Sequence, residues 1–283
     1  DDYGPDPLAE LKELAQSAGG IVVGEAVQRR TAPDSKYYIG AGLAEELSLR
    51  RQALDADTVI FDDELSPSQI RNLENKIGAR VIDRTALILD IFAARAKSVE
   101  GRLQVELAQQ KYRLPRLTGQ GIALSRLGGG IGTRGPGESK LTTDRRHILR
   151  RIHYLENQLK TVTDRRELLR KERARKDVPT VALVGYTNVG KSTLLNVLCE
   201  SEVYAEDKLF ATLDPSVRKL VTEEKRDYLM IDTVGFINKL PHDIVEAFQS
   251  TLEEAACADL LLIVISADNP APEGQLEIVE DIL

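Results

Sequence analysis

A run of eight residues in the second half of the chain matches the phosphate-binding pattern G-x-x-x-x-G-K-[ST]. It lies between an apolar run at 180–184, which predicts a buried strand, and a stretch at 192–198, which predicts a helix. In that context the loop N–H groups can bind phosphate, the lysine can reach the β- and γ-phosphates, and the serine can ligate Mg²⁺. A chance glycine turn would not need the flanking strand and helix. The predicted nucleotide-binding residues here are Gly185, Tyr186, Thr187, Asn188, Val189, Gly190, Lys191, Ser192 and Thr193.

A second motif completes the site. Leu229–Gly235 reads as an apolar strand that ends in D-x-x-G, where the aspartate holds Mg²⁺ through water and the glycine N–H meets the γ-phosphate. Between the two motifs lies Thr212, a hydroxyl ligand that would order its loop only while the γ-phosphate is bound. The predicted metal ligands are Ser192, Thr212 and, through water, Asp232. The other predicted nucleotide-binding residues are Phe210, Ala211, Thr212, Leu213, Asp214, Asp232, Thr233, Val234 and Gly235.

The group that orients the attacking water cannot be assigned from the sequence. Phe236 follows the D-x-x-G motif directly, where Ras-type enzymes carry glutamine, and a phenyl ring cannot polarise water. We therefore expect slow intrinsic hydrolysis and leave the catalytic residue unknown. His242 and Asp243 lie close downstream, but a helix start explains both residues.

Base recognition is the part of the site that the sequence does not supply. An N-K-x-D motif is expected after the strand predicted at 260–265, and none appears before Leu283. The similar run 238–241 has proline in place of aspartate and comes too early. The sequence therefore predicts a phosphate-binding domain that is incomplete at its C-terminal end, and it leaves guanine and adenine as alternatives.

The elements around these motifs predict an α/β protein of 283 residues in three parts. Residues 1–83 predict a small α/β domain with a largely parallel sheet, 84–177 a long antiparallel helical hairpin, and 178–283 a P-loop domain. In the first part, Ser66 and Gln69 form a capping-box pattern around a proline at the first helical position. The helices expected there are 8–18, 43–54 and 66–78, and the strands are 21–23, 37–39, 58–61 and 80–82.

Apolar residues at alternating spacings of three and four predict the seam of the hairpin. The second helix is expected over 142–176, and the tip loop over 118–140, where 8 of 23 residues are glycine. The seam residues are Leu89, Phe92, Ala96, Val99 and Leu103 in the first helix, and Ile148, Ile152, Leu155, Leu159, Val162 and Leu169 in the second.

The charge of the chain is concentrated in this hairpin. Residues 111–176 hold 18 Lys and Arg against 6 Asp and Glu, a balance of +12, although the whole chain carries −7. One basic segment in an acidic chain suggests a local polyanion contact, and flexible glycine-rich backbone with arginines suits irregular RNA. A disordered connector would explain the composition of the loop equally well. The candidate RNA-binding residues are Arg113, Arg116, Arg126, Arg134 and Lys140.

The composition is that of a globular protein and gives no sign of a membrane or secreted protein. Hydrophobic residues make up 42% of the chain and charged residues 29%, which is ordinary for a globular protein. The longest apolar run, 260–265, is too short to span a membrane, and the first residues do not resemble a secretory signal. We expect a cytoplasmic monomer. Cys199 and Cys257 lie in no metal-binding spacing and in apolar helical contexts, so we expect both to be reduced core residues.

Together the motifs resemble the HflX family of ribosome-associated GTPases, in the Obg-HflX-like superfamily. The resemblance rests on the glycine–arginine run 129–138, on 100–109, and on the motifs at 185–192, 210–215 and 232–243. It implies an enzyme that hydrolyses GTP with Mg²⁺, binds the large ribosomal subunit, and dissociates stalled or idle ribosomes, often under stress. It also implies that the tip loop contacts rRNA near the peptidyl-transferase centre and that the ribosome stimulates hydrolysis.

Two other functions fit the same residues less fully. A signalling GTPase could use the hairpin to recruit a protein effector, and a P-loop ATPase could act on RNA. Sedimentation with ribosomal subunits separates the first of these from the ribosomal function, and competition between GTP and ATP tests the second.

Overall fold

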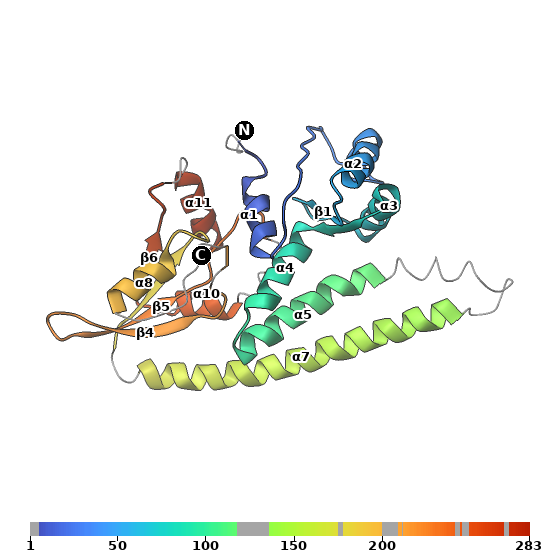
Figure 1. Ribbon diagram of the computed structural model, residues 1–283. Helices are drawn as coiled ribbons and strands as arrows, with labels where there is room; N and C mark the ends of the chain where they lie inside the picture. The colour runs from blue at the N-terminus through green and yellow to red at the C-terminus, as the bar shows by residue number, and fades with distance from the viewer. Residues whose placement is uncertain are drawn as a thin grey trace. The chain divides into compact units, whose positions relative to one another are not determined.

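The computed structural model describes residues 6–117, 136–174, 178–199, 209–210, 212–240, 244, 249–268 and 272–283 (Figure 1). The chain forms two compact units. The first comprises Asp1–Asp90 with Gln109–Tyr154, and the second comprises Ile91–Ala108 with Leu155–Leu283. Two long helices, α5 (Val99–Arg116) and α7 (Pro136–Ala174), therefore contribute residues to both units.

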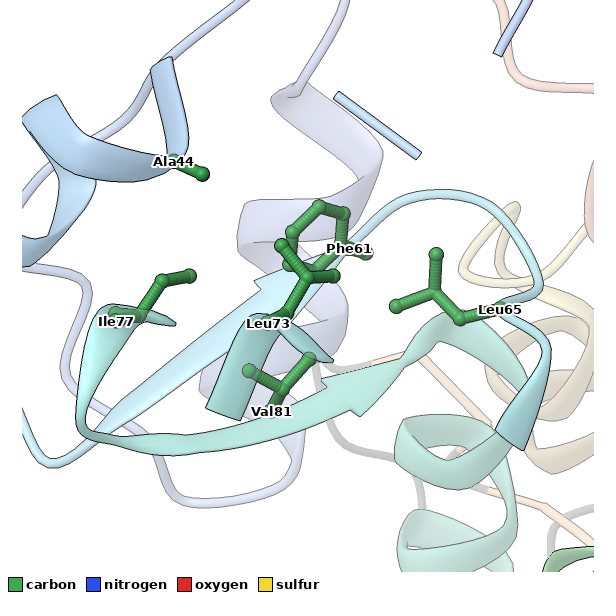
Figure 2. Packing of buried hydrophobic residues seen from close by; sticks show 6 residues of the cluster. All are labelled: Ala44, Phe61, Leu65, Leu73, Ile77 and Val81. Atoms are coloured by element: carbon green, nitrogen blue, oxygen red, sulfur yellow. The ribbon is translucent and has the colours of Figure 1, made fainter. Parts of the chain in front are cut away.

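The first unit is built around a β-α-β segment. Strands β1 (Thr58–Phe61) and β2 (Arg80–Asp83) pair in parallel, and α3 (Pro67–Ile77) connects them. Helices α1 (Ala9–Ser17) and α2 (Ala41–Ala53) precede this segment, and α4 (Arg84–Arg95) follows it. Figure 2 shows the apolar side chains packed between α2, α3 and the two strands. They are Ala44, Phe61, Leu65, Leu73, Ile77 and Val81.

The start of α3 confirms the predicted capping box. The Ser66 hydroxyl accepts the Gln69 N–H at 3.3 Å, and the Gln69 side-chain oxygen accepts the Ser66 N–H at 2.9 Å. Pro67 occupies the first helical position, where its missing N–H costs nothing. The helix ends at Gly78, whose φ of 76° is the left-handed conformation that glycine adopts readily.

Two of the predicted strands in this unit are wrong. The segments 21–23 and 37–39 are not strands, and only an isolated bridge joins Asp34 to Tyr38. The Asp34 carboxylate accepts the N–H groups of Lys36 and Tyr37 at 2.8 and 2.9 Å, so this segment forms a side-chain-stabilised turn instead. Ile21 is 89% exposed, because its short apolar run has no neighbouring strand in the described residues with which to pair.

The hairpin helices differ from the prediction at their ends. The first predicted helix is interrupted at 96–98, between α4 and α5, and Val99 is 62% exposed rather than part of a seam. Helix α7 begins at Pro136, six residues before the predicted start, so the predicted tip loop 118–140 is too long. Its 39 residues correspond to about 58 Å at 1.5 Å per residue. The seam prediction is confirmed at Ile148, Ile152 and Leu155, which are buried.

The second unit contains a four-stranded sheet in the order β4-β5-β3-β6. Strand β3 pairs in parallel with β5 and β6, whereas β4 is antiparallel to β5. The strands are β3 (Thr180–Gly185), β4 (Ser216–Val221), β5 (Asp227–Asp232) and β6 (Leu260–Val264), and the helices are α8 (Lys191–Cys199), α10 (Gln249–Ala256) and α11 (Pro272–Ile282).

Alternate residues of β3 face opposite sides of this sheet. Leu183 packs with Leu195 of α8 on one side, and Ala182 and Val184 pack with residues of α10 and α11 on the other. Both β3 and β5 end at the same edge of the sheet, with Leu183 opposite Asp232. The loops that follow these two strands therefore start side by side.

Two smaller observations complete the fold. Cys199 is half-buried and Cys257 is exposed, so the prediction that both are core residues is wrong for Cys257. No helix in the described part of the chain is long and apolar enough to cross a membrane.

Candidate nucleotide site

The predicted phosphate-binding loop joins β3 to α8 with the conformation that its glycines allow. A Cβ added to Gly185 would lie 2.4 Å from the Val264 carbonyl oxygen, so only glycine permits the close approach of β6 here. Asn188 and Gly190 have φ of 62° and 93°, in the left-handed region that these two residue types tolerate best. The sequence thus bends the chain between a buried strand and the N-terminus of α8.

Lys191, the first residue of α8, is turned back onto this loop. Its ammonium donates to the carbonyl oxygens of Gly185 at 3.1 Å and Tyr186 at 2.8 Å. The side chain is buried, and this burial lowers the pKa of Lys191 to about 8, while the nearby Asp232 carboxylate opposes the shift. An ammonium that donates to two carbonyl oxygens can exchange them for an anion.

Three oxygen-bearing side chains, those of Ser192, Thr212 and Asp232, meet near the lysine. The Ser192 hydroxyl donates to Asp232 Oδ2 at 2.6 Å and lies 2.7 Å from the Thr212 hydroxyl oxygen. Asp232 is fully buried, and its burial raises the pKa of the carboxyl group, against the hydrogen bond from Ser192. Its other oxygen, Oδ1, is buried and has no hydrogen-bond partner among the described residues. The predicted metal ligands are therefore gathered at one point.

This set of oxygen atoms fits a hard divalent cation, which prefers hydroxyl, carboxylate and water oxygens. The unsatisfied Oδ1 of Asp232 could accept a hydrogen bond from a water molecule on such an ion. Within the described ranges, no group of three or more His, Cys, Asp or Glu side chains could hold a metal ion.

The D-x-x-G segment lies directly against the phosphate-binding loop. The Thr187 N–H donates to the Phe236 carbonyl at 2.7 Å, and the Phe236 N–H donates to the Gly185 carbonyl at 3.1 Å. A Cβ on Gly235 would lie 2.4 Å from Thr187 Cα and 2.9 Å from Lys191 Nζ. Glycine is therefore required at 235 for the two loops to meet around the lysine.

Neighbouring residues of this segment hold it on the sheet. The Thr233 hydroxyl donates to the Leu183 carbonyl at 2.6 Å, and Val234 is buried. Phe236 is also buried, in the apolar cluster with Ala182 and Ile231. That the residue after Gly235 does not orient water remains a prediction. His242 and Asp243, the other residues considered for orienting the attacking water, lie outside the described residues.

The segment that carries Thr212 is held at its first residue. The Phe210 N–H donates to the Thr187 hydroxyl at 2.9 Å, and the Phe210 side chain is fully buried. Phe210 has a φ of 56°, a conformation that costs a non-glycine residue about 1–3 kcal/mol. Leu213 is buried, and Ala211 lies outside the described residues. The Asp214 carboxylate, predicted to bind nucleotide, instead accepts backbone N–H groups at the start of α5.

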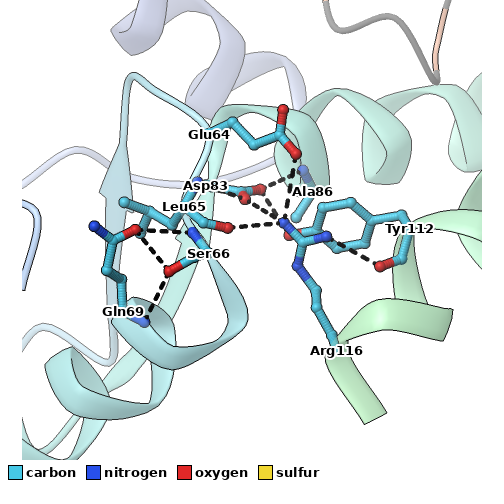
Figure 3. Close-up of polar contacts among 8 residues, drawn as sticks. All are labelled: Glu64, Leu65, Ser66, Gln69, Asp83, Ala86, Tyr112 and Arg116. Carbon is cyan, nitrogen blue, oxygen red and sulfur yellow. Dashed lines mark hydrogen bonds and ion pairs between the residues drawn. The ribbon is translucent and has the colours of Figure 1, made fainter. Parts of the chain in front are cut away.

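The predicted RNA-binding residues do not form one described surface. Arg113 is exposed on α5, Lys140 belongs to α7, and Arg126 and Arg134 lie outside the described residues. Arg116 is instead directed into the first unit (Figure 3). Its guanidinium is 3.0 Å from Asp83 Oδ2 and donates to the Leu65 carbonyl at 3.0 Å.

Sequence reasoning missed the buried network around Asp83. Its carboxylate also accepts the Ala86 N–H at 2.9 Å, which caps α4, and the Tyr112 hydroxyl at 2.7 Å (Figure 3). Burial, followed by the charge of Asp83, raises the pKa of Tyr112. The i, i+4 spacing of Tyr112 and Arg116 on one helix was the available signal, because it places both side chains on one face.

Three family models match consecutive parts of the chain. They are described as "GTP-binding GTPase N-terminal" over residues 6–93, "GTP-binding GTPase Middle Region" over 95–173 and "50S ribosome-binding GTPase" over 180–283. A solved structure of a GTP-binding protein from Sulfolobus solfataricus, in complex with GDP, is 26% identical with a TM-score of 0.52. That likeness covers 99% of this chain and 76% of the archaeal chain.

Relatives named GTPase HflX are more similar in sequence. The protein from Caldanaerobacter subterraneus subsp. tengcongensis is 56% identical over 278 residues, which cover 98% of this chain and 65% of that protein. The protein from Gluconacetobacter diazotrophicus is 43% identical, covering 98% of this chain and 68% of its own length. The chain thus spans about two thirds of the length of such relatives, and it belongs to the HflX family of GTPases.

Proposed function

We propose that this protein is a GTP hydrolase that acts as a switch on the large ribosomal subunit and dissociates stalled or idle ribosomes. The observation that carries the proposal is the convergence of Lys191, Ser192, Thr212 and Asp232 at the ends of β3 and β5. Membership of the HflX family and the match of residues 180–283 to a ribosome-binding GTPase model support the nucleotide and the partner.

Each side chain has a distinct role in binding GTP. Lys191 exchanges its two carbonyl partners for β- and γ-phosphate oxygens. Ser192 and Thr212 supply hydroxyl ligands to Mg²⁺, and Asp232 accepts a hydrogen bond from a water molecule on the ion. When bound, the ion neutralises phosphate charge. Guanine is the proposed base because the relatives are GTPases; the described residues supply no contact that selects it.

Hydrolysis by the protein alone is slow in this proposal. The residue after Gly235 is a buried phenylalanine, so the described site has no side chain there to orient the attacking water. The large subunit would supply the missing geometry, so that hydrolysis follows binding. Loss of the γ-phosphate would release Thr212, and the factor would leave the ribosome.

The hairpin is the proposed RNA-binding part, and the proposed location is the cytoplasm, where the ribosomes are. Arg113, Arg126, Arg134 and Lys140 remain the proposed contacts with rRNA, and their support is the +12 balance of residues 111–176. Arg116 is less suited to this role, because its guanidinium is held by Asp83. We propose a monomer, since one hairpin and one nucleotide site suffice for this activity.

The test is sedimentation of the full-length protein with isolated 50S subunits, in a non-hydrolysable GTP analogue or in GDP. We expect binding that depends on the GTP analogue and is weakened by Arg126→Glu, Arg134→Glu and Lys140→Glu together, with unchanged nucleotide affinity in the free protein. Lys191→Ala should abolish nucleotide binding while leaving the first unit folded. Association with a soluble effector instead of the subunit would favour a signalling GTPase. Equal affinity for ATP would favour an RNA-directed ATPase.

A further inference from the structure

The loop that carries Thr212 is held from two sides within the second unit. On the nucleotide side, Thr212 contacts Ser192 at 2.7 Å, and the Phe210 N–H donates to Thr187 at 2.9 Å. On the other side, the Phe210 ring meets the Phe92 ring of α4 edge to face, with ring centroids 4.7 Å apart. The same short segment therefore touches both the predicted metal ligands and the helix that precedes α5.

Asp214, two residues after Thr212, extends this second contact to the start of α5. One oxygen of its carboxylate accepts the N–H of Lys97 at 2.8 Å and that of Ser98 at 2.7 Å, and the other oxygen accepts the Ser98 hydroxyl. The Ser98 hydroxyl oxygen in turn accepts the Gly101 N–H at 2.8 Å. Ser98 is thus the N-cap residue of α5, and its own N–H is satisfied by a carboxylate more than a hundred residues away.

This arrangement is a capping box made from two distant segments. In the usual box, the residue three positions after the N-cap is Glu or Gln, and its side chain accepts the N–H of the N-cap residue. Here that position is Gly101, which has no side chain, and Asp214 accepts the N–H instead. A Cβ on Gly101 would lie 2.3 Å from Asp214 Oδ1, so the glycine makes room for the incoming carboxylate.

The first turn of α5 is also joined to α7 and α10. Arg166 of α7 donates to Glu100 of α5 at 2.7 Å and forms an ion pair with Glu253 of α10. The turn capped by Asp214 is therefore connected to one hairpin helix and to α10, which lies later in the chain than the D-x-x-G segment.

We propose that Asp214 is a positioning residue that completes the N-terminal cap of α5, and that it makes this cap depend on whether Thr212 is held by a nucleoside triphosphate. The inference rests on the proposed nucleotide site and adds the route by which the site is connected to the hairpin. When the γ-phosphate is lost and Thr212 is released, Asp214 leaves Lys97 and Ser98. Because coupling is reciprocal, a partner that fixes α5 would equally favour the ordered Thr212 loop.

Amide hydrogen exchange of Lys97 and Ser98 measures the cap directly, because their N–H groups are the donors. In the full-length protein we expect exchange at these two amides to be about tenfold slower with a non-hydrolysable GTP analogue than with GDP, the size of a typical capping interaction. Asp214→Ala should remove this difference. Asp227→Ala, which removes a carboxylate paired with Lys219 on the strand surface, is the matched control and should retain it.

The Gly101→Ala variant distinguishes a positioning role of Asp214 from an effect on the stability of helix α5. Alanine is the better helix former, so a purely structural role for this site predicts unchanged or slower exchange. If Asp214 couples the segments, the new Cβ displaces its carboxylate and the nucleotide dependence disappears. Gly274→Ala is the control, because Gly274 occupies the same position in α11 and an added Cβ there meets nothing within 4 Å.

A variant in which α5 forms its own capping box provides the last comparison. Combining Gly101→Glu with Asp214→Ala rebuilds the ordinary capping pattern, so slow exchange should return but should be equal in the two nucleotides. The proposal is overturned if Lys97 and Ser98 exchange equally in both nucleotides in the unaltered protein, or if Asp214→Ala keeps the difference. Nucleotide affinity is measured first: failure to bind GTP would refute the proposed function as well, whereas normal binding with an unresponsive cap refutes this inference alone.

Discussion

Nucleotide binding should weaken as the pH rises through 8, because Lys191 must be charged to meet phosphate. In the structure, its ammonium is buried against the carbonyl oxygens of Gly185 and Tyr186, and burial lowers the pKa from 10.5 to about 8. A bound triphosphate would surround the same ammonium with negative charge and raise its pKa well above this value. Binding at alkaline pH is therefore linked to the uptake of a proton.

The size of the effect follows from the two protonation states. With a pKa of about 8, roughly nine-tenths of the lysine is charged at pH 7 and roughly one-tenth at pH 9. If the bound pKa stays above 9, the apparent affinity falls about tenfold over this interval, or about 1.4 kcal/mol. The affinity falls rather than rises because the nucleotide-free state loses its proton at a lower pH than the bound state.

Equilibrium titration with a fluorescent GTP analogue between pH 7 and pH 9, at constant ionic strength, measures this linkage. Lys191→Arg is the control, because a guanidinium stays charged across the range. Titration of the nucleotide itself affects both proteins equally, so the informative quantity is the difference between their slopes. Identical slopes would show that the buried lysine is not the titrating group and would contradict the account of its environment.

Three further predictions concern packing and buried charge. Leu73→Ala, in the fully buried core of the first unit, should lower the free energy of unfolding by about 2–5 kcal/mol in urea denaturation. Arg116→Met leaves the buried Asp83 carboxylate without its ion-pair partner and should cost about 3–5 kcal/mol in the same assay; a change below 1 kcal/mol would contradict its structural role. Gly235→Ala should weaken GTP binding at least tenfold in nucleotide titrations, because its Cβ would overlap Thr187 Cα, and unchanged affinity would show that the loops can separate.

The sequence predicted elements correctly where the residues that stabilise them lie close together in the chain. The α3 capping box was predictable because Ser66 and Gln69 lie three residues apart and each side chain accepts the other residue's backbone N–H. The strand predicted at 21–23 failed because an apolar run becomes a strand only beside a partner strand, and its composition says nothing about that partner. The break before α5 was missed because an uninterrupted apolar spacing concealed Ser98, whose cap is completed from residue 214.

In the candidate site, too, the residues of known motifs were predicted, whereas contacts between distant segments were not. Lys191, Ser192 and Asp232 were predicted because their motifs carry fixed positions relative to strand ends, and parallel strands bring those ends together. The orientation of Asp214 could not be predicted, because its partners lie in another part of the chain. The burial of Arg116 was missed for the same reason, since its basic neighbours indicated solvent and RNA rather than a carboxylate at the end of β2.

Most polar groups of the site hydrogen-bond to one another, although Oδ1 of Asp232 has no partner among the described residues, and this affects how ligands bind. Lys191 is held by two carbonyl oxygens, and Ser192 contacts both Thr212 and Asp232. A phosphate or cation must therefore replace the existing hydrogen bonds of Lys191 and Ser192, so each ligand alone gains little net free energy from these two groups. Phosphate and cation together replace all of these contacts and neutralise each other's charge, which favours their joint binding. Because Thr212 contributes to one of the contacts replaced, we expect the loop that reaches α5 to respond to which nucleotide is bound.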